Sequence, residues 1–113
     1  MSTTEFIEKL RRAPDQVAFQ DTMDVIDQNF EYTPTAFQNG NVYSKAGDNE
    51  GSCKLFAFAK FFNLNQKETL HCFGNFYREV LENPNGENHQ NIRNFMKTGW
   101  AEVEFEGEPL VLK

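Results

Sequence analysis

The feature that most constrains the fold is a phenylalanine-rich segment in the middle of the chain, from Leu55 to Phe62. At about 100° per residue, its apolar side chains occupy most of the circumference of a helix, which only Lys54 and Lys60 interrupt. A helix that is apolar on nearly all sides belongs inside a domain. The sequence therefore predicts a central helix over residues 52–62, with the other elements packed around it.

A polar loop, residues 39–52, leads directly into this helix. Asp48, Asn49, Glu50 and Ser52 carry oxygens that can accept hydrogen bonds from the free N–H groups of the first helical turn. The carboxylates would also complement the positive end of the helix dipole. The same residues are the best functional candidates, because Asp48 and Glu50 offer a carboxylate pair for acid–base chemistry or for a divalent cation. Helix capping and function both remain open at this loop.

The length of the chain favours one domain, residues 1–113, with a single core. The net charge is −6 and the 11 Lys and Arg residues are scattered, which argues against a nucleic-acid partner because phosphate binding needs a clustered basic patch. An acidic membrane surface would repel the chain as well.

Export through the Sec pathway and membrane insertion are not expected. The run from Leu55 to Phe62 is less than half of the about 20 residues that a membrane span needs. The first residues lack the basic-then-apolar pattern of a signal peptide. Cys53 and Cys72 are too few for a secreted disulfide framework, so both are predicted to be reduced thiols. These features predict a cytoplasmic protein.

The spacing of apolar residues predicts four further helices, over 2–12, 21–30, 66–82 and 88–98. Ser2 with Glu5, and Asn65 with Glu68, have the spacing of capping boxes at the starts of the first and third of these. Gly74 lies within the apolar face of the 66–82 helix, so we expect another helix to cross close to it.

Two segments are expected to be extended. Pro34 biases residues 31–35 away from helix, and residues 100–112 alternate apolar and polar side chains around Glu106-Gly107, which predicts a hairpin. The sequence as a whole predicts an α+β fold, mainly α, with about five helices packed around the Phe-rich central helix (52–62) and a small antiparallel sheet formed by residues 31–35 and this C-terminal hairpin.

His89 and Arg93 lie four residues apart on the last predicted helix, so both flank its buried face. One interpretation is an anion or carboxylate site in which Arg93 is the bidentate donor. The alternative is structural: Arg93 pairs with a carboxylate such as Glu50, and His89 occupies the helix N-terminus.

Other reactive side chains give weaker patterns. His71 and Cys72 are adjacent, so on a helix they diverge by about 100° and cannot both reach one metal ion. Cys53 near a helix N-terminus would be an activated thiolate, although a free cysteine is usually a buried and inert residue. Trp100 either lines a ligand pocket or lies at the edge of the core. We assign no catalytic residue, no metal and no cofactor.

Four blocks of the sequence together carry a family resemblance. They are Thr33-Pro-Thr35 with Phe37 and Asn39-Gly40; residues 49–54; Thr69-Leu70 with Phe73-Gly74 and Tyr77; and residues 89–96 with Gly99-Trp100. In these blocks, which extend over essentially the whole chain, the sequence resembles the HopJ type III effector family. The family takes its name from an effector that plant-pathogenic bacteria inject into host cells.

The resemblance implies a small bacterial protein, and it implies no catalytic activity or cofactor. It leaves two locations open: the bacterial cytoplasm, or a host cell after type III secretion. Secretion signals of this type tend to be disordered and Ser-rich, whereas residues 2–12 are predicted to form a capped helix, which favours the cytoplasm.

Three functional hypotheses follow. The first is a non-enzymatic binding protein, for an unknown small ligand or protein partner, with a polar site between the 39–52 loop and the 88–98 helix. The second is a small enzyme that uses Glu50, His89 or Cys53. The third is an effector that acts on a host protein. The candidate ligand-binding residues are Asn39, Asn49, Glu50, His89, Arg93 and Trp100.

Overall fold

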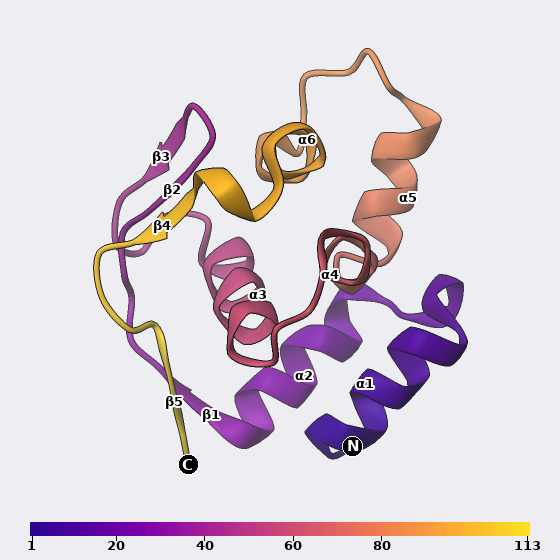
Figure 1. The fold of residues 1–113 in the computed structure, drawn as a ribbon, viewed down its shortest axis with the longest axis vertical. Helices are drawn as coiled ribbons and strands as arrows, with labels where there is room; N and C mark the ends of the chain where they lie inside the picture. Colours follow the sequence, from indigo (N-terminus) through magenta and orange to yellow (C-terminus); the bar gives the residue numbers. More distant parts are fainter.

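The computed structural model describes residues 1–113, and the phenylalanine-rich helix α3 (Glu50–Phe61) lies at its centre (Figure 1). Leu55, Phe56 and Phe58 are completely buried. The Phe56 ring lies 6.1 Å from that of Phe37 on one side and 5.0 Å from that of Phe95 on another. The predicted buried central helix is therefore confirmed, although it begins two residues earlier than expected.

Six α-helices, two 3₁₀ turns and five short strands make up the chain. In order they are α1 (Thr3–Arg12), η1 (Pro14–Gln16), α2 (Phe19–Asn29), β1 (Phe30–Tyr32), β2 (Phe37–Asn39), β3 (Val42–Ser44), α3, α4 (Gln66–Cys72), α5 (Asn75–Glu82), α6 (Gln90–Thr98), η2 (Gly99–Glu102), β4 (Val103–Phe105) and β5 (Leu110–Leu112). The α+β, mainly α, prediction is confirmed. None of these helices has the length and the apolar character needed to cross a bilayer.

Both predicted capping boxes form. The Glu5 N–H donates to Ser2 Oγ and the Ser2 N–H donates to Glu5 Oε1, both at 3.1 Å. At the start of α4, the Glu68 N–H donates to Asn65 Oδ1 at 2.8 Å, and the Asn65 N–H donates to Glu68 Oε1 at 3.0 Å. These caps involve only residues three apart, which is why sequence spacing identifies them.

The predicted C-terminal hairpin is wrong. β4 pairs antiparallel with β2, whereas β5 pairs antiparallel with β1, so the two segments expected to pair with each other belong to separate small sheets. Both pairings share one register, and residues 103–112 run alongside residues 30–39, with Pro34 and Pro109 between the paired stretches. Proline cannot donate to a ladder, which explains the interruption. The expected association of residues 31–35 with the C-terminal segment is present in the β1–β5 pairing, but the pairing of that segment with itself is not.

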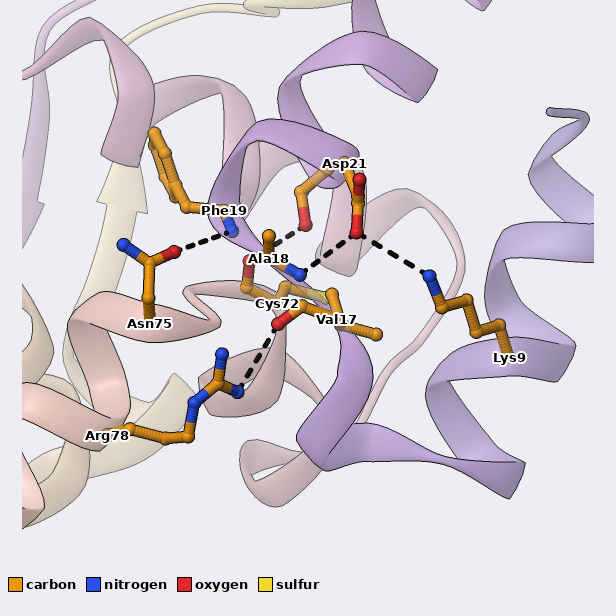
Figure 2. Close-up of polar contacts among 9 residues, drawn as sticks. Lys9, Val17, Ala18, Phe19, Asp21, Cys72, Asn75 and Arg78 are labelled. Carbon is orange, nitrogen blue, oxygen red and sulfur yellow. Dashed lines mark hydrogen bonds and ion pairs between the residues drawn. The ribbon is translucent and has the colours of Figure 1, made fainter.

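The predicted 66–82 helix is interrupted at Gly74, which has φ +55° and separates α4 from α5. Residues 17–19, which lead from η1 into the first residue of α2, lie directly against this break. The Phe19 N–H donates to Asn75 Oδ1 at 3.1 Å, and Arg78 Nη1 donates to the Val17 carbonyl at 3.3 Å (Figure 2). The expected close approach at Gly74 is present, but the approaching segment is the chain entering α2 and not a crossing helix.

The start of α2 is fixed from its other side as well. Asp21 accepts a hydrogen bond from the Ala18 N–H at 3.0 Å and lies 3.6 Å from Lys9 Nζ of α1 (Figure 2). Thr22 Oγ1 donates to the Cys72 carbonyl at the end of α4 at 2.7 Å. The junction therefore ties α1, α2, α4 and α5 together.

Gly74→Ala is expected to lower the free energy of unfolding by about 3 kcal/mol. A Cβ there would lie 2.6 Å from both Phe19 N and Val17 O, in a backbone conformation that alanine rarely adopts. Denaturant unfolding of the variant and the wild type measures the change. Gly107→Ala is the control, because a Cβ at Gly107 meets only Thr35 Cγ2 at 3.6 Å. Equal stability of the two variants would contradict this account of the break.

Candidate functional site

A pocket of about 440 Å³ lies where the N-termini of α3 and α6 meet. Its wall combines aromatic rings with short polar side chains and helix-start backbone. The lining residues are Phe19, Val42, Asn49, Gly51, Ser52, Phe73, Phe76, His89, Gln90, Asn91 and Ile92. Apolar walls with a few convergent polar groups are typical of small-molecule sites.

The polar part of the pocket consists of two helix starts that no side chain caps. The N-cap residues, Asn49 of α3 and His89 of α6, both have left-handed backbone conformations, with φ 52° and 53°. Neither side chain accepts a hydrogen bond from its helix. The side-chain capping considered for residues 48–52 is therefore not formed, and the N–H groups of the first two residues of each helix stay open.

Hydrogen bonds fix the elements around these helix starts. Asn39, at the end of β2, is completely buried, and its Nδ2 donates to the Asn91 carbonyl at 2.9 Å and to Asn91 Oδ1 at 3.0 Å. Asn49 Nδ2 donates to Ser44 Oγ of β3 at 2.9 Å. The β2–β3 hairpin thus positions both helix starts.

The apolar part of the pocket is an aromatic cluster. The Phe19 ring stacks on that of Phe73 with centroids 6.2 Å apart and meets the edge of Phe76 at 5.1 Å. The Phe76 ring lies 5.2 Å from the His89 imidazole. Gly51 makes room for this cluster, because a Cβ there would lie 2.8 Å from Phe19 Cζ.

Arg93 is buried, but its guanidinium does not pair with Glu50, and the residue does not line this pocket. Its guanidinium donates to the carbonyl oxygens of Asn83, Pro84 and Asn88 and to Asn88 Oδ1, at distances between 2.6 and 3.2 Å. Arg93 therefore anchors the loop between α5 and α6, and the pairing with Glu50 considered from the sequence is wrong. The bidentate geometry expected to bind an anion is instead used for backbone carbonyls.

Some of the candidate ligand-binding residues line the pocket, one lies behind its wall, and the others lie elsewhere in the structure. Asn49 and His89 line the pocket, and Asn39 supports it from behind through Asn91. Glu50 is exposed at the first turn of α3 and is not part of the lining. Trp100 lies elsewhere, with its Nε1 donating to the Leu64 carbonyl at 3.0 Å.

Sequence reasoning missed most of the lining. Ser52 had been considered as part of the polar loop, whereas Gly51, Gln90 and Asn91 were not singled out, although they fall within the two blocks of the family resemblance that border the site. Their positions in those blocks were the available indication. Phe73 belongs to another block of the resemblance, whereas Phe19 and Phe76 carried no indication, because phenylalanine spacing predicts core packing equally well.

Neither cysteine has the environment of a nucleophile. Cys53 is completely buried and donates from Sγ to the Thr35 carbonyl at 3.4 Å. Burial raises the pKa of the Cys53 thiol, and the same effect raises the pKa of the Cys72 thiol. No three His, Cys, Asp or Glu side chains are grouped closely enough to hold a metal ion.

Both thiols of the folded protein are expected to react slowly with iodoacetamide at neutral pH, because the raised pKa values keep them protonated and burial denies access. Mass spectrometry of timed samples measures the reaction, and the same protein in guanidinium chloride is the control in which both thiols react quickly. Rapid stoichiometric labelling of Cys53 in the folded protein would instead support the enzyme hypothesis.

Comparisons with known proteins agree with this architecture. The model of a family described as HopJ type III effector protein matches residues 3–110. A solved structure, described as the crystal structure of unknown function protein VPA0580, is similar over 100% of this chain and 95% of its own, with a TM-score of 0.98 and 46% sequence identity. Among curated proteins, none matches the chain.

Proposed function

The chain belongs to the HopJ type III effector protein family, and we propose that it acts as a binding protein whose ligand enters the pocket between the 39–52 loop and α6. The observation that carries this proposal is the convergence of two uncapped helix N-termini on one aromatic-lined pocket. By contrast, α1 and α4 are capped by their N-cap side chains, and α5, which also lacks a side-chain cap, begins at Gly74, outside the pocket lining.

The rigidity of the surrounding structure supports binding of a preferred ligand. Asn39 and Asn91 are buried and hydrogen-bonded to each other, and the Phe19 ring is packed between Phe73 and Phe76. Groups held in this way lose little conformational entropy when a ligand binds, which favours affinity and selectivity. A pocket of this size would enclose a small molecule or one protruding side chain of a partner.

Binding has more support than catalysis. His89 is the one titratable side chain in the lining, and its Nε2 lies 3.5 Å from Glu79 Oε2. No hydrogen bond joins His89 to Ser52 or to a cysteine, so the pair of nucleophile and base that covalent catalysis uses is not assembled. Glu50 and Cys53, the other two candidates, lie outside the lining.

A second function, that of an effector acting on a host protein, is favoured by the family to which the chain belongs. A fusion of about the first 15 residues to a reporter tests whether this terminus acts as a type III secretion signal, which is expected to be a disordered and accessible segment. In this chain Thr3–Arg12 forms α1, with Arg11 Nε 2.8 Å from Glu68 Oε2. Transfer of the reporter by a type III system would support the effector function, and retention in the bacterium would count against it.

A screen of small organic fragments by amide NMR is expected to shift the resonances of Gly51, Ser52, Gln90 and Asn91. Ser52→Phe would fill the pocket and is expected to weaken binding of the fragments by about tenfold or more, because a bulky side chain would occupy their volume. Chemical-shift titrations of both proteins measure the change.

Lys67→Phe is the matched control, since Lys67 is exposed on α4 outside the pocket. Denaturant unfolding of each variant establishes that it is folded. Fragments that shift the amides around Phe61 and Leu112, which border a different surface hollow, and leave the pocket unchanged would disprove the proposed site.

A further inference from the structure

We propose that this pocket selects small organic anions, with the oxygen atoms of the ligand at the junction of the α3 and α6 N-termini and its flat apolar body against the phenylalanine rings. The inference rests on the proposed function, because it names the ligand class of the same site. Four independent features of the pocket carry it: a free side-chain donor, free backbone donors, the absence of lining carboxylates, and the aromatic wall.

The first feature is the Asn91 side chain, which is 7% exposed and lines the pocket. Asn39 Nδ2 donates to the Asn91 backbone carbonyl, which can only accept, so the Asn39 group facing Asn91 is its NH₂. The Asn91 atom that meets the same NH₂ must then be Oδ1. Asn91 Nδ2 is left without a hydrogen-bond partner in the protein, and it remains accessible at the pocket wall as a donor for a ligand acceptor.

The second feature is the backbone of the two helix starts. The N–H groups of Gly51 and Ser52 in α3, and of Gln90 and Asn91 in α6, make no hydrogen bond. All four residues line the pocket. Helices of 12 and 9 residues each present the positive end of a dipole there, and two such ends at one place favour a negatively charged ligand.

The third feature is the charge of the lining. The chain has 17 Asp and Glu residues and a net charge of −6, yet none of the 11 lining residues is acidic. Asp48 and Glu50 flank the lining residue Asn49 in the sequence and Glu79 contacts His89, but none of these three carboxylates is part of the lining. An anion inside the pocket therefore meets donors and one imidazole, whereas most of the protein surface would repel it.

The fourth feature specifies the body of the ligand. The rings of Phe19, Phe73 and Phe76 supply only apolar surface, so an inorganic anion would leave them wet or empty. A flat apolar group would bury this surface and gain the hydrophobic contribution that a small hydrophilic anion cannot. The combination selects an organic anion over both a bare anion and a neutral aromatic.

Three probes separate these contributions in amide NMR titrations of the full chain. Benzoate carries the charge and the ring, benzamide the ring without the charge, and acetate the charge without the ring. We expect benzoate to shift Gly51, Ser52, Gln90 and Asn91 and to bind about tenfold or more tightly than either of the others. Benzamide binding as tightly as benzoate would overturn the anion requirement, and acetate binding as tightly would overturn the apolar body.

Asn91→Asp tests the assigned donor. An aspartate keeps an acceptor for Asn39 Nδ2, so the buried hydrogen bond is retained, but it replaces the free NH₂ with a negatively charged oxygen. Benzoate binding is expected to weaken about tenfold or more, with benzamide binding little changed. Asn63→Asp is the control, because it makes the same charge change just after the C-terminus of α3. The 12 residues of α3 place this end about 18 Å from the N-terminus that borders the pocket.

The outcomes distinguish the anion inference from the proposed function. If pocket amides respond equally to benzoate and benzamide, or if Asn91→Asp binds benzoate as the wild type does, the anion inference fails while the binding site stands. If neither these probes nor any fragment of the screen shifts the pocket amides, the proposed site and the anion inference both fail.

Discussion

A helix that is apolar on nearly every side must be enclosed, and the enclosure of α3 determines where the other elements lie. α2 and α4 pack along it (Figure 1), and β5 borders it. The rings of Phe37 from β2 and Phe95 from α6 close over Phe56. Only the ends of α3 reach polar surroundings. Its N-terminus emerges beside that of α6, so the burial of the helix also creates the place where two sets of free N–H groups meet.

The second determinant of the site is the break at Gly74. Because this residue has a positive φ and no side chain, the chain entering α2 can lie directly against it, and Phe19 is carried between Phe73 and Phe76. A continuous helix over 66–82 would leave no place for residues 17–19 there. The aromatic wall of the pocket is therefore a consequence of backbone geometry far from the polar loop in sequence.

Sequence reasoning succeeded where the determining interactions are local. The two capping boxes and the apolar faces of the helices depend on residues three or four apart, and they were predicted correctly. It failed where partners are distant: the strand pattern of 103–112 is compatible with self-pairing and with pairing to 30–39, and nothing local distinguishes the two. The contacts of Arg93 and the Asn39–Asn91 hydrogen bonds likewise join segments whose proximity only the tertiary structure defines.

The uncapped helix starts are the least expected feature, because the sequence contains residues able to cap them. Asparagine is among the best N-cap residues, and a cap contributes about 1 kcal/mol, yet the Asn49 side chain donates to Ser44 and its backbone has a left-handed conformation. His89 repeats that conformation at α6. Side chains cap α1 and α4, and α5 begins without a cap at Gly74, whereas α3 and α6 are the two uncapped helices whose N-cap residues line one pocket. Stability given up at one shared place is the pattern expected of a binding site, where donors are held ready for a ligand.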